Sequence, residues 1–226
     1  MPSELFVLTS ADRTLTGAQT LRGWYLPEAA HPYYLLAPHA TIDFAAPKGA
    51  NPPLDESSVK KYGTHQRTQL YKDEESVRFL TDPVHKKLSE VQFRDYDAIF
   101  YVGGHGPVID LPTDKDNIKL IGEVSPPNRG RAEEWVYNLL GNADGKLNFA
   151  GRTFTGFSNE EEVQVDKVAD IPFLLEDRIQ DLGGKYVKAD KAWGVKIAVD
   201  GKLITGQNPA SASAVGKALL QALGVH

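Results

Sequence analysis

Apolar residues fall in short runs separated by stretches with helical spacing. Three runs have the length and the branched or aromatic content of buried strands: Leu5 to Leu8, Thr41 to Ala45 and Ala98 to Val102. Weaker strand candidates follow at 152–155, 185–188, 195–199 and 203–205.

Helix-like segments lie between these strands. Pro27 suits the first turn of a helix, and Pro32 is expected to end or bend that helix. Further helices are predicted at 116–123, 132–140, 172–181 and 210–223. Because strands and helices alternate, the pattern predicts an α/β fold with a mostly parallel sheet and helices on both faces.

The length favours one domain over the whole chain, residues 1–226. Within it, the segment 48–72 is rich in Pro, Lys, Ser and Gln and lacks periodicity, so we expect an irregular surface excursion. A lid over a site and an inert insertion explain such a segment about equally well.

Charge and composition exclude several classes of function. Lys and Arg total 25 against 30 Asp and Glu, so a nucleic-acid partner is not expected. The sequence contains no cysteine, which excludes disulfides, thiolate metal sites and cysteine nucleophiles. Without paired histidines at helical spacing, a Walker loop or a GxGxxG pattern, we expect no metal and no cofactor.

No apolar run is long enough to span a membrane. The start of the sequence, MPSE, has no basic segment leading into an apolar stretch. We therefore expect a cytoplasmic protein with no membrane partner.

The sharpest candidate for chemistry is the run Gly103-Gly104-His105-Gly106, directly after a predicted strand. Ligands of open α/β sheets bind beyond the carboxyl ends of the strands, where glycines let backbone N–H groups approach an oxygen. A tight turn that needs positive φ explains the same glycines.

A second candidate is Glu28, at the start of the predicted first helix. Its neighbours Trp24, Tyr25 and Leu26 indicate partial burial, and burial raises the pKa of a carboxyl, as a general acid or base requires. An exposed acid that favours the helix dipole is a sufficient structural alternative.

Two further segments follow predicted strands. In the run Ser158-Asn159-Glu160-Glu161-Glu162, capping of a helix by Ser158 or Asn159 is the favoured interpretation. Asn208 lies just before the last predicted helix, where its amide could close one wall of a pocket, although the start of a helix alone explains the segment.

Six blocks carry a resemblance to a known family: GWYLPEAAHPYY, IDFAAPKG, DYDAIFYVGGHGPVIDLP, GRTFTGFSNEEE, IPFLLEDRIQDLGGKY and LITGQNPASASAVGKALL. In this order, from about Leu5 to Leu223, they resemble the ThiJ/PfpI superfamily, in particular its glyoxalase III and heat-shock-chaperone branch, which is class I glutamine amidotransferase-like.

The resemblance implies a flavodoxin-like α/β sandwich, commonly a homodimer, with its site at the carboxyl edge of the sheet. The family's usual catalyst is a cysteine in a strand-to-helix elbow, written A-V-C-H-G-P, followed by a histidine and approached by a glutamate. By motif match, Glu28 corresponds to that glutamate, and Gly103 and Gly104 correspond to residues near the oxyanion site.

The elbow itself is missing from the segment 122–142, which has neither the apolar strand nor the C-H-G-P turn. Ser125 is the nearest hydroxyl, but two prolines follow it and make a poor start for a helix. Glu133 or Glu134, at the start of the predicted helix 132–140, falls nearer the vacated position.

We therefore predict a cofactor-independent, cysteine-independent acid/base enzyme of lyase, isomerase or cyclase type, acting on a small carbonyl compound. One alternative is a non-catalytic pseudo-enzyme or chaperone-like dimer. Another is glyoxalase III-like conversion of methylglyoxal, for which the missing thiol closes the usual covalent route. The predicted catalytic residues are Glu28, His105 and Glu133, and the predicted substrate contacts are Gly103, Gly104, Trp24 and Asn208.

Overall fold

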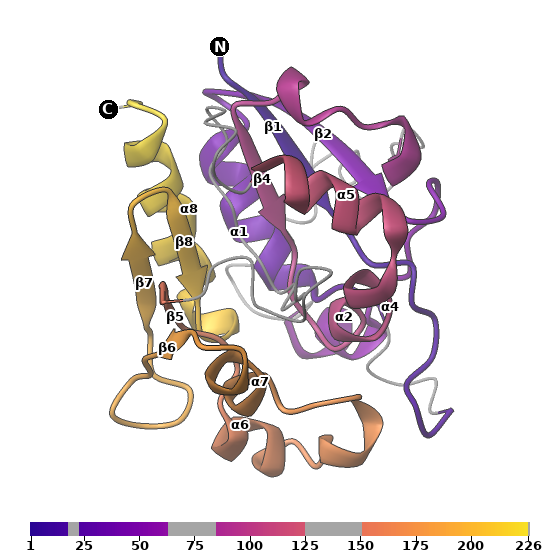
Figure 1. Ribbon diagram of the computed structural model, residues 1–226, viewed down its shortest axis with the longest axis vertical. Helices are drawn as coiled ribbons and strands as arrows, with labels where there is room; N and C mark the ends of the chain where they lie inside the picture. Colours follow the sequence, from indigo (N-terminus) through magenta and orange to yellow (C-terminus); the bar gives the residue numbers. More distant parts are fainter. Residues whose placement is uncertain (18–22, 63–84, 125–150, 226) are drawn as a thin grey trace.

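A parallel sheet of four strands, in the order β3-β2-β1-β4, forms the centre of the fold (Figure 1). The computed structural model describes residues 1–17, 23–62, 85–124 and 151–225. Within the sheet, Phe6 lies opposite both Phe44 and Phe100. The strands are β1 (Ser3–Val7), β2 (Thr41–Ala46), β3 (His85–Lys87) and β4 (Ala98–Tyr101).

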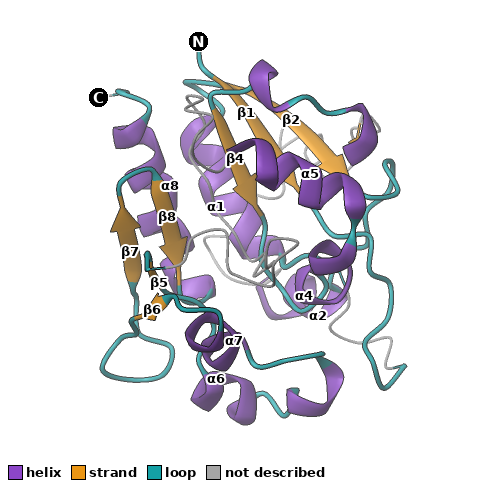
Figure 2. Cartoon of the chain, in the orientation of Figure 1, coloured by secondary structure: helices purple, strands orange, loops and turns teal. Residues whose placement is uncertain are grey.

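Helices surround this sheet and follow its strands (Figure 2). They are α1 (Leu26–Leu36), α2 (Glu56–Tyr62), α4 (Pro107–Asp110), α5 (Lys115–Val124), α6 (Asn159–Gln164), α7 (Leu175–Asp181) and α8 (Ala212–Ala222). None of these helices, all within the described ranges, is both long and apolar enough to span a membrane.

Helices α1 and α5 cover opposite faces of the sheet. Phe100 and Tyr101 are neighbours in β4, so their side chains point to opposite faces. The Phe100 ring packs on Phe6, whose ring meets Tyr33 of α1 edge-on. The Tyr101 hydroxyl donates a hydrogen bond to Asn117 of α5 at 2.8 Å. The predicted α/β sandwich with helices on both faces is confirmed.

Helix α1 does not end at Pro32, as one expectation had it, but continues to Leu36. Pro32 lacks the N–H that would bond to the carbonyl of residue 28, which costs the helix one hydrogen bond. Helix α8 packs along α1, with Gly216 against Pro32, where a Cβ would lie 3.0 Å from the proline Cα. This close packing stabilises the continued helix.

Two short strand pairs complete the described part of the chain. Strands β5 (Thr153–Phe154) and β6 (Lys185–Tyr186) are parallel, and β7 (Ile197–Asp200) and β8 (Leu203–Gly206) form an antiparallel pair. The Thr155 N–H donates to the Thr205 hydroxyl at 2.9 Å, which joins the segment after β5 to β8. These contacts bring the segments that follow β5 and β8 side by side.

The weaker predicted strands correspond to β5 to β8, with ends that differ by at most two residues. Helix α2 lies inside the segment 48–72. Strand β3 was not predicted from the sequence, because three residues are too short for a recognisable period. Helix α6 is the helix that Ser158 or Asn159 was predicted to cap, although its extent was not predicted. The predicted helix 132–140 lies outside the described residues.

A buried carboxyl lies in the central strand. Glu4 of β1 is fully buried, and within the described ranges neither oxygen of its side chain has a hydrogen-bond partner. Burial, reinforced by the nearby carboxylate of Asp97, raises the pKa of Glu4 from 4.5 to about 8. The native protein therefore holds a proton on Glu4 at neutral pH that the unfolded chain releases.

Because Glu4 binds this proton only in the folded state, we expect the stability of the protein to depend on pH. The substitution Glu4→Gln should remove that dependence. The free energy of unfolding of the native sequence should fall as the pH rises from about 4.5 to about 8, because the folded state binds the extra proton. Each unit of pKa shift corresponds to about 1.4 kcal/mol, so the fall should amount to several kcal/mol. Denaturant unfolding at pH 5 and pH 8 measures it, with the exposed Glu56→Gln as control. Equal slopes for the native and Glu4→Gln proteins would contradict the assignment.

Candidate functional site

The turn after β4 packs directly against the segment that leads into α1. Gly104 has φ +120°, and a Cβ there would lie 3.0 Å from the Gly23 carbonyl oxygen and 3.1 Å from the Tyr25 nitrogen. The Tyr25 N–H donates to the Gly103 carbonyl at 3.0 Å. Glycine is therefore required at position 104 by both its conformation and the available space.

Glu28 lies in the first turn of α1, close to this glycine turn. Its N–H donates to the Tyr25 carbonyl at 3.1 Å, and Tyr25 is bonded in turn to Gly103. Only 8% of Glu28 is exposed. The short chain of bonds fixes the start of α1, which carries the largely buried Glu28, next to the turn that follows β4.

The glycine turn also presents unused backbone donors. Within the described residues, the N–H groups of Gly104 and His105 donate to no acceptor. Both residues are partly exposed. Such N–H groups at the end of a strand suit stabilisation of a negatively charged oxygen.

Asp110 ties the far side of this turn to the end of β1. One carboxylate oxygen accepts from the Thr9 hydroxyl at 2.7 Å, and the other accepts from the Ser10 N–H at 2.6 Å. Burial raises the pKa of Asp110, and these two hydrogen bonds act against that rise. The carboxyl ends of β1 and β4 are thereby held together.

His105 forms the most direct polar contact at this edge. Its Nε2 lies 2.8 Å from Oε1 of Glu162, in the first turn of α6. The side chains are 18% and 7% exposed, respectively. The Phe157 ring meets the imidazole edge-on, with centroids 6.1 Å apart. The turn after β4 and the start of α6 therefore meet through a largely buried acid–imidazole pair.

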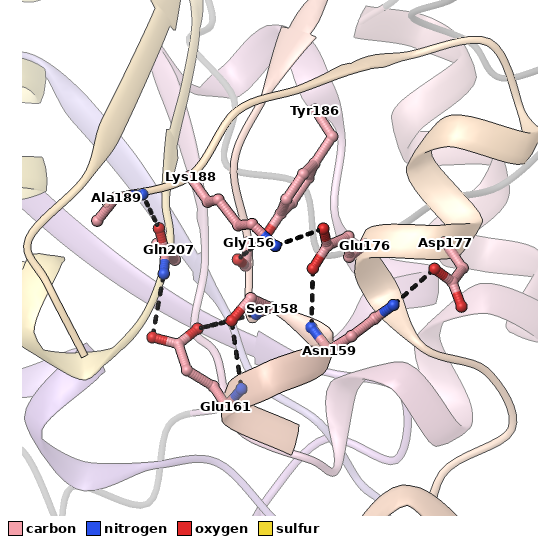
Figure 3. A network of polar contacts seen from close by, with 10 residues as sticks. All are labelled: Gly156, Ser158, Asn159, Glu161, Glu176, Asp177, Tyr186, Lys188, Ala189 and Gln207. Carbon is pink, nitrogen blue, oxygen red and sulfur yellow. Dashed lines mark hydrogen bonds and ion pairs between the residues drawn. The ribbon is translucent and has the colours of Figure 1, made fainter. Parts of the chain in front are cut away.

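The neighbouring Glu161 is fully buried and accepts five hydrogen bonds. Figure 3 shows its contacts with Ser158 and Gln207. Oε2 accepts from the N–H and the hydroxyl of Ser158, each at 2.8 Å. Oε1 accepts from the Trp193 N–H at 2.7 Å, from Gln207 at 3.0 Å and from Asn208 at 2.8 Å. The predicted capping by Ser158 is confirmed as a capping box with Glu161. The carboxylate also fastens two distant segments to the start of α6.

A second set of polar contacts surrounds this carboxylate (Figure 3). Glu176 of α7 accepts from Lys188 at 2.9 Å and from the Asn159 N–H at 2.9 Å. The Tyr186 hydroxyl donates to the Gly156 carbonyl at 2.8 Å. Burial, together with nearby Glu176 and Glu161, raises the pKa of Tyr186, so this phenol stays a donor. The network holds α6 against α7 and β6.

The two remaining predicted substrate contacts lie within the framework. Asn208 is buried, and its amide donates to Glu161 and to the Gly194 carbonyl at 2.9 Å. Trp24 is also buried, and its indole N–H donates to the Pro52 carbonyl at 3.4 Å. A role for either in binding substrate stays a prediction.

Glu133, Glu134 and Ser125 lie outside the described residues. Sequence reasoning did not single out Glu161 or Glu162, because a run of glutamates after a capping serine is explained by the helix dipole. The side chains of successive helix residues point about 100° apart around the helix axis. This spacing could have indicated that Glu161 and Glu162 have different partners. One carboxylate turns to the framework and the other to His105.

Within the described part of the chain, no group of three or more His, Asp or Glu side chains is arranged to hold a metal ion. His105 and Glu162 supply two ligand atoms at most. The arrangement favours proton transfer and hydrogen bonding as its chemistry.

Two curated relatives align along nearly the whole chain. The glutathione-independent glyoxalase HSP31 of Saccharomyces cerevisiae is 27% identical over 230 residues, which covers 97% of each chain. Glyoxalase 3 of Candida albicans is 27% identical and covers 94% of each. No protein-family model matches the chain.

Solved structures agree with the fold. The 24 kDa rapid encystment protein of Francisella tularensis has a TM-score of 0.84 and 29% identity, with 99% of both chains covered. Glyoxalase III of Candida albicans has a TM-score of 0.78 at 22% identity, with 98% and 97% covered. A ThiJ/PfpI domain protein of Brachyspira murdochii has a TM-score of 0.60 at 12% identity, with 98% and 96% covered. The chain has the ThiJ/PfpI-like fold, and the curated relatives that it resembles are glutathione-independent glyoxalases.

Glu161→Ala should destabilise the protein by roughly 3 kcal/mol, because five donors lose their acceptor and most of them are buried. Glu160→Ala, an exposed glutamate on the same turn of α6, should change stability by less than about 0.5 kcal/mol. Chemical denaturation of both variants measures the difference. Similar small effects would show that the network does not stabilise the fold.

Proposed function

We propose that this ThiJ/PfpI-like chain converts small 2-oxoaldehydes such as methylglyoxal into 2-hydroxy acids, without glutathione and without a thiol. The proposal rests on one observation: a buried carboxyl, Glu28, fixed beside a glycine turn at the carboxyl edge of the sheet. Similarity to glutathione-independent glyoxalases over almost the full length supports the choice of substrate.

The absence of cysteine changes the route but not the overall reaction. In water a 2-oxoaldehyde adds water at its aldehyde carbon, C1, to give a hydrate. The hydrate of methylglyoxal is an isomer of lactic acid, so no oxidant or reductant is needed. The remaining step moves one hydrogen from C1 to C2, the ketone carbon. This reaction belongs to the acid/base class that the sequence predicts.

Glu28 is the group proposed to move that hydrogen. As a carboxylate it removes the C1 proton, and the electron pair of the C–H bond forms a C1–C2 double bond. The ketone oxygen then becomes an enolate oxygen, and the unused N–H groups of Gly104 and His105 are suited to stabilise it. The protonated Glu28 returns the proton to C2, and the transfer of one proton from a C1 hydroxyl to the oxygen on C2 then gives the 2-hydroxy acid.

Glu28→Gln should lower kcat for lactate formation from methylglyoxal by at least about 100-fold, because an amide cannot accept the C1 proton. Glu56→Gln removes a glutamate from the first turn of α2, where it is exposed, and should leave the rate unchanged. Both variants are purified in parallel with the native protein, so that a contaminating enzyme would appear equally in all three.

Two results would contradict the proposal in different ways. Full activity of Glu28→Gln would assign the proton transfer to another group. A native protein that forms neither lactate from methylglyoxal nor the 2-hydroxy acid from phenylglyoxal would favour the non-catalytic alternative.

A further inference from the structure

We propose that His105 is a second proton-transfer group of this site and that Glu162 is the positioning residue that holds its imidazole. The inference rests on the proposed function and deepens it. Conversion of a hydrate into a 2-hydroxy acid requires two proton movements. One runs from carbon C1 to carbon C2, and the other runs from a C1 hydroxyl to the oxygen on C2.

The second movement follows from the balance of atoms. When C2 of the enolate takes its proton, the electron pair of the double bond forms the new C–H bond. C1 then carries two hydroxyl groups and must release one proton to become a carboxylic acid. The oxygen on C2 carries a negative charge and must gain one proton to become a hydroxyl. A single base that accepts the proton from the C1 hydroxyl and donates it to the oxygen on C2 completes the reaction.

A carboxyl occupied with the carbon-to-carbon transfer cannot serve both oxygens at the same time. His105 belongs to the turn whose backbone N–H groups are proposed to contact the substrate oxygen. Imidazole is well suited to the oxygen-to-oxygen transfer, because one nitrogen can accept a proton and return it near neutral pH.

The contact with Glu162 fixes the form of that imidazole. Nε2 lies 2.8 Å from a carboxylate oxygen, which only accepts hydrogen bonds, so Nε2 carries a hydrogen. In the neutral ring, Nδ1 then holds the lone pair and is the atom that can act as base. The Phe157 ring against the imidazole further restricts its rotation.

The use of Glu162 contrasts with that of its neighbour. Glu161 accepts five hydrogen bonds that hold the framework together. Among the described residues, the side chain of Glu162 is bonded to His105 alone. The Glu162 side chain is 7% exposed and, with His105 as its one partner, holds no other segments of the fold together. Its contribution is therefore expected through His105.

A double-mutant cycle separates positioning from a merely structural role. His105→Ala should lower kcat for methylglyoxal about 100-fold, and Glu162→Ala should lower it about 10-fold. If Glu162 acts through His105, the double variant should match His105→Ala within about twofold. Glu160→Ala removes an exposed glutamate from the same helix turn and should leave kcat unchanged. Additive losses, or full activity of either single variant, would overturn the proposal.

Nuclear magnetic resonance of the six histidines tests the positioning without relying on turnover. The ¹³Cδ2 and ¹⁵N shifts of His105, assigned by comparison with His105→Ala, should show hydrogen on Nε2 in the native protein. Glu162→Ala should give a mixture of both neutral forms, whereas Glu160→Ala should not. An unchanged His105 signal in Glu162→Ala would overturn the positioning role even if the protein proves inactive. Absence of turnover with the expected shifts would instead count against the proposed function alone.

Discussion

The buried carboxylate of Glu161 is the interaction on which the geometry of the candidate site depends. It joins the start of α6 to Trp193 and to the segment of Gln207 and Asn208, which follow it by 32 to 47 positions. Hydrogen bonds to a buried charge are stronger than those between neutral groups. Because α6 is only six residues long, its own hydrogen bonds could not fix its direction. The orientation of Glu162 toward His105 is thus a consequence of the Glu161 network.

The opposite side of the site is fixed by close packing at Gly104 and by hydrogen bonds to Asp110. Gly104 brings the turn after β4 within contact of Gly23 and Tyr25, and Asp110 ties the same turn to the end of β1. A Cβ at position 104 would separate the turn from the start of α1. The backbone donors and the Glu28 carboxyl keep their relation only while these two segments touch. Each half of the site is therefore held by contacts that take no part in the proposed chemistry.

The sequence predicts the strong elements well and the connections between them poorly. The runs that form β1 and β4 are mostly apolar and buried on both faces, and such runs have few alternatives. Strand β3 is stabilised by its pairing with β2, so its own three residues carry little signal. Helix α6 is indicated in the sequence only by the capping residues at its start. Glu28 and the glycine turn were singled out because strand ends and helix starts are recognisable. The pairing of Glu162 with His105 was not, because it joins residues 57 positions apart.

Loss of a thiol changes which step of 2-oxoaldehyde chemistry a protein must accelerate. A thiolate supplies a strong nucleophile at C1, whereas water adds to this aldehyde without help and leaves the proton movements as the slow part. General acid/base groups contribute about 10² to 10⁴-fold each, so one carboxyl alone gives a modest catalyst. With two groups, one can transfer the proton between the carbon atoms while the other transfers the proton between the oxygen atoms. In the proposed reaction, His105 supplies a second ionisable group at the carboxyl edge, where it is held by a carboxylate with no other partner among the described residues.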